Sequence, residues 1–311
     1  MNIRILPLAL LCLLLAACGA DAGARRTVYA MDTVMELTAY GGTEAALDAA
    51  EAELNRLDRL LARGDRQSAV YAYNHGADAD AELSALIAEA EAVSAATDGA
   101  FDPCLGAVLD LWGFGSGAGA YRVPDGAALS AAPPLLDLGG IAKGLALERV
   151  RDILAARGVT GAVIDLGGDV ALLGRKPDGA AWRVAVRDPD GGYLGVLETA
   201  GGAYVATSGV YERYFEENGV RYHHIIDPRT RRPAESGTVS ATVSCESGVW
   251  ADALATACCV LGRDGALRLR ERLADTMPFE LILVDDGGTV TYTSPAFTPE
   301  PGKGYTYVLQ E

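Results

Sequence analysis

Five short segments of β-forming sequence follow one another in the middle of the chain, and no helical segment separates them. They are 162–165, 170–173, 182–187, 194–199 and 203–206. Within the third segment, Trp182, Val184 and Val186 occupy alternate positions, as in a strand with one buried face. Strands and helices do not alternate strictly along the chain. We therefore expect an α+β fold with a mixed, largely antiparallel sheet and packed helices.

Amphipathic helices flank this β-rich middle. Apolar residues at helical spacing predict helices over 44–62, 80–96, 141–157, 249–261 and 264–274. Further strands are expected over 28–39, 222–226, 238–244, 279–284 and 290–293, the last two forming a hairpin. The segment 112–134 is rich in Gly, Ala and Pro and is expected to be a loop. Half of the residues are hydrophobic, which is enough for a sizeable core.

The N-terminus has the pattern of a bacterial lipoprotein signal. An apolar run over 5–15 follows a basic start and is short for a membrane span. Leu15-Ala16-Ala17-Cys18 then matches a lipobox, which predicts cleavage before Cys18 and diacylglycerol on its thiol. An ordinary secretory signal with a chance cysteine is the alternative.

This pattern divides the chain into a signal peptide, 1–17, a flexible tether, 18–27, and one folded domain, 28–311. The lipid on Cys18 would be the only attachment to the membrane. We therefore expect the mature protein on the extracytoplasmic face of the cell membrane.

The charge balance limits the possible partners. The chain has 26 basic and 42 acidic residues, a net charge of -16, whereas nucleic acid binding needs clustered Lys and Arg. We therefore expect no nucleic acid partner. Beyond the N-terminal region, Cys104, Cys245, Cys258 and Cys259 form neither a disulfide framework nor a metal-binding spacing. The adjacent pair lies in an apolar helical segment and is expected in the core.

The first segment with a chemical signature is Asp137-Leu-Gly-Gly-Ile-Ala-Lys143-Gly144. Two glycines precede a predicted helix whose first turn carries Lys143. Free N–H groups at a helix start, together with an ammonium group, suit a phosphate. Asp137 could accept a bond from a hydroxyl or a ring N–H. A tight strand-to-helix connection with a solvated lysine would use the same residues, and the spacing is not that of a Walker A loop.

A second signature lies on the helix predicted over 249–261. Asp252 and Thr256 are four residues apart and share one face of the helix. A carboxylate and a hydroxyl supply two hard oxygen ligands for Mg²⁺. The alternative is that Asp252 is a first-turn charge favoured by the helix dipole.

Other polar segments allow two interpretations each. His223 and His224 would face opposite sides of a strand, so only one of them could join a given site. That histidine could act as a base, or it could be a partly buried histidine that is hydrogen-bonded to the backbone. The segment 165–169 suits a hairpin turn, although its glycines could admit a ligand. Phe101 and Asp102 follow a helix stop and could bind a planar ring or form a packed turn.

Together, these segments resemble the ApbE family of flavin transferases. The matching stretches are Met31-Asp-Thr33, Gly99-Ala-Phe-Asp-Pro103 with Leu111-Trp-Gly-Phe114, Asp137-Leu-Gly-Gly-Ile-Ala-Lys-Gly144, Gly167-Gly-Asp169, Ala206-Thr-Ser-Gly209 with Tyr211, His224-Ile-Ile-Asp-Pro-Arg-Thr230 and Ala251-Asp-Ala-Leu-Ala-Thr256. They extend over residues 28–262. Each motif is weak alone, but their order and joint presence are specific.

The resemblance implies a Mg²⁺-dependent flavin transferase domain. Such an enzyme cleaves the pyrophosphate of FAD, attaches FMN to a Thr or Ser hydroxyl of an acceptor protein, and releases AMP. FAD contacts are implied for Met31, Ala100, Phe101, Asp102, Asp137, Lys143 and the Ile225-Ile226 stretch. The implied Mg²⁺ ligands are Asp252, Thr256 and the backbone carbonyl of Gly140, and His224 is the implied base, with Lys143 and Asp252 also catalytic. Family members are commonly exported lipoproteins, which agrees with Cys18.

Four positions depart from the family pattern. Asp32 and Arg231 stand where the family usually has Gly, and Cys104 stands where it usually has Thr. Gly64 stands in place of an aromatic residue that stacks on the flavin, and Tyr71 or Tyr73 could replace it.

Two other functions use the same residues. One is hydrolysis of FAD to FMN and AMP with water as the acceptor. The other is a non-catalytic lipoprotein that binds FAD, which would not need the pair Asp252 and Thr256.

Overall fold

The computed structural model describes residues 23–42, 44–115, 120–199 and 201–310. The predicted signal peptide, Cys18 and the first part of the tether lie outside these residues. No helix within the described ranges is long and apolar enough to cross a membrane. Residues 24–27, which we assigned to the tether, belong to the first strand, so the folded domain begins earlier than predicted.

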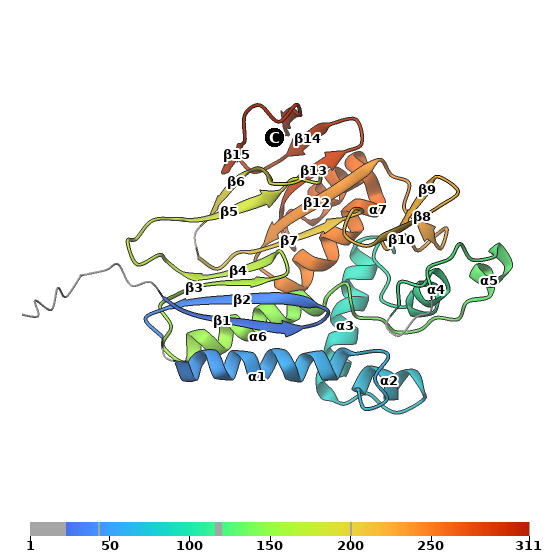
Figure 1. Ribbon diagram of the computed structural model, residues 1–311, viewed down its shortest axis with the longest axis horizontal. Coiled ribbons are helices and arrows are strands. Elements are labelled where there is room, and N and C mark those ends of the chain that lie inside the picture. Colours follow the sequence, from blue (N-terminus) through green and yellow to red (C-terminus); the bar gives the residue numbers. More distant parts are fainter. Residues whose placement is uncertain (1–22, 43, 116–119, 200, 311) are drawn as a thin grey trace, which may run out of the picture.

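A nine-stranded sheet forms the centre of the molecule (Figure 1). In spatial order its strands are β1 (Ala24–Ala30), β2 (Thr33–Tyr40), β3 (Gly161–Leu166), β4 (Asp169–Gly174), β7 (Tyr204–Gly209), β12 (Thr238–Cys245), β13 (Glu280–Asp285), β14 (Thr289–Tyr292) and β16 (Thr306–Leu309). Neighbouring strands are antiparallel except β14 and β16, which are parallel. The expected largely antiparallel sheet is confirmed.

Three long helices pack against this sheet. They are α1 (Glu44–Leu61), α6 (Ala142–Ala156) and α7 (Gly248–Leu273). The described residues also form α2 (Ala69–Asn74), α3 (Ala81–Ala96), α4 (Gly106–Trp112) and α5 (Gly126–Ala131). Figure 1 shows α1, α6 and α7 along the strands, with α6 in contact with both other helices. Gly262 has a φ of 71° and bends α7 between the two helices predicted over 249–261 and 264–274. Cys258 and Cys259 are buried, as expected for core residues.

The other face of the sheet carries a small second sheet of β5 (Trp182–Arg187), β6 (Tyr193–Thr199) and β15 (Phe297–Pro299). Alternation along β13 separates the two faces, because successive side chains of a strand point to opposite sides. Leu281 and Leu283 join the core that includes the helices, whereas Ile282 and Val284 pack with Leu197 of β6.

The strand predicted over 28–39 is wrong, because the chain reverses inside it. Ala30 pairs with Thr33, and the two residues between them, Met31 and Asp32, have φ values of 49° and 59°. Two consecutive residues with positive φ make a type I′ hairpin turn, for which Asn-Gly, Asp-Gly and Gly-Gly are the usual signals. Asp32 adopts the conformation that favours Gly, although an apolar β-forming sequence surrounds it.

The region around 222–226 also differs from the single strand predicted there. Two hairpins replace it: β8 (Tyr214–Glu217) with β9 (Val220–His223), and β10 (Ile226–Asp227) with β11 (Arg232–Pro233). The loop predicted over 112–134 contains α5, whose first turn is capped by Asp125. Strands of two to four residues and a one-and-a-half-turn helix are too short for periodicity to reveal.

The structure gives a reason for one departure from the family pattern, Arg231 in place of Gly. Its φ is 59°, which would favour Gly. Its guanidinium donates hydrogen bonds to the carbonyls of Leu129, Ser130 and Ala132 at 2.7, 3.2 and 2.9 Å. These carbonyls lie at the end of α5, where regular helical bonding runs out, and that of Leu129 also accepts the N–H of Ala132 at 3.4 Å. The side chain therefore contributes contacts that oppose the cost of its backbone conformation.

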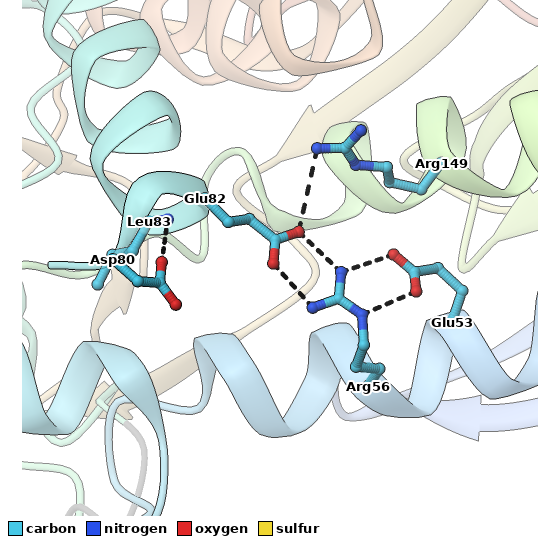
Figure 2. A network of polar contacts seen from close by, with 6 residues as sticks. All are labelled: Glu53, Arg56, Asp80, Glu82, Leu83 and Arg149. Atoms are coloured by element: carbon cyan, nitrogen blue, oxygen red, sulfur yellow. Dashed lines mark hydrogen bonds and ion pairs between the residues drawn. The ribbon is translucent and has the colours of Figure 1, made fainter.

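An ion network joins α1, α3 and α6 at the surface (Figure 2). The guanidinium of Arg56 bonds to the carboxylates of Glu53 and Glu82 at 2.7 Å each, and Arg149 lies 4.0 Å from Glu82. Glu82 is in the first turn of α3, two residues after the N-cap Asp80. The network links the first turn of α3 to α1 and α6, and the far end of α3 leads toward Phe101.

Candidate active site

The candidate site begins at the turn before α6. The N–H of Gly139 donates to Oδ1 of Asp137 at 2.9 Å, which closes the turn. A Cβ at Gly140 would lie 2.9 Å from Cε2 of Phe101, so a glycine is needed where the buried aromatic ring packs on the backbone. Three residues that the sequence assigned to FAD binding or the metal therefore lie at one turn.

Two glycines bring α6 and α7 into close contact. A side chain on Gly144 would collide with the backbone of Gly248, and one on Gly248 would collide with Gly144. The close approach places the carboxylate of Asp252 at the start of α6, where its Oδ2 accepts the N–H of Gly144 at 3.0 Å. Two segments more than 100 residues apart thus share one buried carboxylate.

The donor atoms at this junction suit a hard divalent cation. In a regular turn the N–H of Gly144 would bond to the carbonyl of Gly140, but here it bonds to Asp252. Among the described residues, no N–H bonds to that carbonyl, which keeps its lone pairs for a ligand. The hydroxyl of Thr256 lies one turn after Asp252 and 3.0 Å from the hydroxyl of Ser208. Carboxylate, hydroxyl and carbonyl oxygens are the atoms that Mg²⁺ prefers.

Lys143 forms an ion pair that the sequence did not predict. Its Nζ lies 2.6 Å from Oδ2 of Asp169, which is 1% exposed. The other oxygen of Asp169 accepts the N–H of Thr207 at 2.9 Å. The segment 165–169 is indeed a hairpin turn, with Gly167 and Gly168 between β3 and β4. The motif Gly167-Gly-Asp169 could have marked Asp169 as a site residue. Its pairing with Lys143 appears only in the folded structure.

The charges of this cluster act on one another. Burial raises the pKa of Asp252 to about 7, and the nearby carboxylate of Asp169 adds to the rise, while Lys143 opposes it. Burial by itself would lower the pKa of Lys143, but Asp169 and Asp252 outweigh this effect and raise it. Lys143 therefore stays positively charged. The ionised form of Asp252 is destabilised, because the positive charge near it does not offset the effects of burial and of Asp169. Added positive charge at Asp252 would be stabilising.

The two histidines point to different partners. His223 is buried, and its Nε2 lies 3.1 Å from the carbonyl of Ala234. Nδ1 of His224 lies 3.2 Å from the carbonyl of Arg213. A carbonyl can only accept, so Nδ1 of His224 carries the proton and Nε2 has the free lone pair. Burial, with help from the charge of Arg213, lowers the pKa of His224 to about 3 and keeps the imidazole neutral.

The remaining predicted FAD contacts are spread over neighbouring elements. The N–H of Met31 donates to Oδ1 of Asp58 at 3.0 Å, and Asp102 accepts the N–H of Cys104 at 2.8 Å. Ala100 is buried in the main core. Ile226 is buried in a separate cluster around Trp112, so its side chain supports the 222–233 region.

Tyr71 and Tyr73, which could replace the aromatic residue missing at Gly64, both lie on α2. Tyr71 stacks on His75 with ring centroids 3.8 Å apart, and Tyr73 is 39% exposed. Next to Gly64, the buried guanidinium of Arg63 binds Asp137 and Asp110. Neither Arg63 nor Asp110 was predicted as a site residue, because charged side chains in or next to a helix are normally solvated.

The fold matches that of solved flavin transferases. A flavinyl transferase from Pseudomonas stutzeri, solved without ligand, superimposes with a TM-score of 0.77 at 31% identity, covering 89% of this chain and 96% of that one. The model of the ApbE family matches residues 31–279. The chain belongs to the ApbE family.

Two sequence relatives carry the same functional name. A FAD:protein FMN transferase from Vibrio cholerae is 36% identical over 69% of this chain and 70% of its own length. A FAD:protein FMN transferase from Rhodobacter capsulatus is 34% identical over 84% of this chain. The chain spans 55% of the length of the Rhodobacter relative.

Proposed function

We propose that the chain is a Mg²⁺-dependent FAD:protein FMN transferase. It cleaves the pyrophosphate of FAD, joins FMN through a phosphoester to a Thr or Ser hydroxyl of an acceptor protein, and releases AMP. The observation that carries the proposal is the buried carboxylate of Asp252 on the N–H of Gly144, beside the ion pair of Lys143 and Asp169. The names of the relatives support the same activity.

The chain's own residues position charge for this reaction. Phosphoryl transfer depends on positioning and on neutralising developing negative charge, more than on covalent help from the protein. Asp252, Thr256 and the carbonyl of Gly140 would hold Mg²⁺, which when bound neutralises phosphate oxygens as a Lewis acid. Lys143 supplies a second positive centre, and its pairing with Asp169 fixes the direction of the ammonium group.

His224 is the candidate base for the incoming hydroxyl. The hydroxyl oxygen bonds to the phosphorus of the FMN half, the bond from that phosphorus to the bridging oxygen breaks, and AMP leaves with that oxygen. The proton of the hydroxyl passes to Nε2 of His224, which is free because Nδ1 is bonded to the carbonyl of Arg213. The contacts of Met31, Ala100, Phe101, Asp102, Asp137 and Ile226 with FAD belong to the same proposal.

Mass spectrometry of an acceptor protein tests the activity. The acceptor is incubated with the chain, FAD and Mg²⁺, and AMP is measured in parallel. Transfer predicts an FMN adduct on a Thr or Ser together with AMP. AMP with free FMN and no adduct would establish hydrolysis instead. FAD binding without AMP would establish a non-catalytic flavin carrier.

We also propose that Cys18 carries a lipid that anchors the protein to the extracytoplasmic face of the cell membrane. The support is the sequence Leu15-Ala16-Ala17-Cys18 after an apolar run. Intact mass of the mature protein should show loss of residues 1–17 and added acyl chains, and Cys18→Ser should move the protein to the soluble fraction. A mature chain of unmodified mass would refute the anchor.

A further inference from the structure

Arg63 is a buried cation that lies directly behind the turn of the candidate site. Its side chain is 8% exposed. Nε donates to Oδ2 of Asp137 at 2.8 Å, and the two terminal nitrogens donate to the oxygens of Asp110 at 2.8 and 2.6 Å. One guanidinium therefore binds two carboxylates from segments that are far apart in the sequence. Arginine suits this task because its planar group presents several donors in a fixed geometry.

Two glycines leave the room that this side chain occupies. A Cβ at Gly106 would lie 3.1 Å from Cδ of Arg63, and one at Gly115 would collide with Arg63 and Asp110. A buried charge is tolerated only where it is paired and hydrogen-bonded. The residues around Arg63 therefore hold the guanidinium in one orientation, in which its Nε–H donates to Asp137.

The backbone of the turn is fixed without Arg63. The side-chain amide of Asn74 exchanges two hydrogen bonds of 2.9 Å with the backbone of Leu136. The N–H of Asp137 donates to the carbonyl of Pro103 at 2.7 Å. What Arg63 adds is control of the Asp137 carboxylate, whose second oxygen already accepts the N–H of Gly139. Removing Arg63 would thus release a side chain and leave the path of the main chain in place.

We propose that Arg63 is a positioning residue for FAD, acting through Asp137. It orients the carboxylate at the entrance to the turn that leads to Gly140 and Lys143, and it neutralises one negative charge beside a site that must accept an anionic pyrophosphate. The proposal rests on the proposed function, since it requires that FAD bind at this turn. Arg63 itself contacts no substrate.

A double-mutant cycle on FAD affinity tests the proposal. Arg63→Met is made in the unaltered chain, in Asp137→Asn and in Asp110→Asn, and the Kd for FAD is measured by flavin fluorescence. We expect Arg63→Met to raise the Kd about tenfold in the unaltered chain and in Asp110→Asn, which is the usual scale for losing a hydrogen bond to a charged group. In Asp137→Asn the same change should alter the Kd by less than about twofold. Arg63 is proposed to act on FAD only through the Asp137 carboxylate, which this background already lacks.

A general loss of packing would behave differently. It would raise the Kd equally in all three backgrounds, and this result, or an unchanged Kd in the unaltered chain, would overturn the role of Arg63. If Arg63→Met does not fold, Arg63→Lys provides the same cycle, because it keeps the charge and loses the fixed fork. If the unaltered chain binds no FAD, the proposed function fails together with this inference, whereas normal binding with an additive cycle refutes the inference alone.

Discussion

Asp252→Asn separates the charge of the proposed metal ligand from its place in the fold. Asparagine has the same shape, and its side-chain oxygen can still accept the N–H of Gly144, which Asp252 accepts at 3.0 Å. The substitution removes the negative charge and replaces one acceptor oxygen by an NH₂ donor. Because that charge is buried beside Asp169, we expect the variant to fold and to lose its affinity for Mg²⁺.

The size of the effect follows from the pKa of Asp252. Burial raises it from the ordinary 3.8 to about 7 in the metal-free chain, so the folded state holds a proton that the unfolded state releases. This group therefore costs the fold stability as pH rises from about 4 to about 7, by at most about 4 kcal/mol at about 1.4 kcal/mol per pKa unit. Mg²⁺ binds the ionised carboxylate and should restore that stability at pH 8 but not at pH 5.

Urea unfolding at pH 5 and pH 8, with Mg²⁺ or a chelator, measures these free energies. In chelator at pH 8 the asparagine variant should be more stable than the unaltered chain, and Mg²⁺ should not stabilise it further. Its rate of AMP release should fall at least about 100-fold, since the metal contributes several kcal/mol to such reactions. Asp165→Asn, in the nearby hairpin, is the matched control and should keep the Mg²⁺ effect. Equal stabilisation of the Asp252 variant by Mg²⁺, or normal AMP release, would refute the metal site.

Three further results are expected. Asp169→Asn should lower the free energy of unfolding by about 3 kcal/mol, because it leaves Lys143 charged and without its 2.6 Å partner; urea unfolding measures this, and a neutral effect would contradict the ion pair. Arg231→Gly should destabilise the chain by about 1 kcal/mol in thermal unfolding, because three lost hydrogen bonds outweigh the relieved backbone, and a stabilised variant would reverse that ranking. His224→Gln should flatten the pH dependence of stability on the acid side. The folded imidazole has its pKa lowered to about 3, so unfolding takes up a proton below about pH 6.5 and stability falls as pH drops from there toward 3. An unchanged pH profile in this variant would show that His224 titrates normally.

Local sequence patterns were sufficient to predict the long helices and to identify the family. The helices predicted over 44–62 and 80–96 lie within a residue of α1 and α3, because apolar spacing over four turns leaves few alternatives. The hairpin of β13 and β14 is also confirmed, and the boundary between the helices predicted over 249–261 and 264–274 falls at the non-helical Gly262. The family is confirmed because its motifs recur in one order, and order is a property of the sequence itself.

Short or strained elements were predicted less well. The reversal at Met31 and Asp32 was missed because Met31 is not a usual residue for positive φ and no glycine accompanies Asp32 in the turn. The neighbouring strands nevertheless have enough pairing to impose that turn on them. The split of the strand predicted over 222–226 has the same origin, since contacts with other segments set such boundaries.

The sequence alone determined which chemical groups are available: a carboxylate and a hydroxyl on one helical face, a lysine at a helix start, and an α+β framework to hold them. Only the tertiary structure decided their partners. Asp169 meets Lys143, Arg63 meets Asp137, and the N–H of Gly144 turns from Gly140 to Asp252. The reason is physical: these contacts join residues 26 to 108 positions apart, and each depends on how closely helices and strands approach. Local propensity carries no information about such distances, because packing of the whole core sets them.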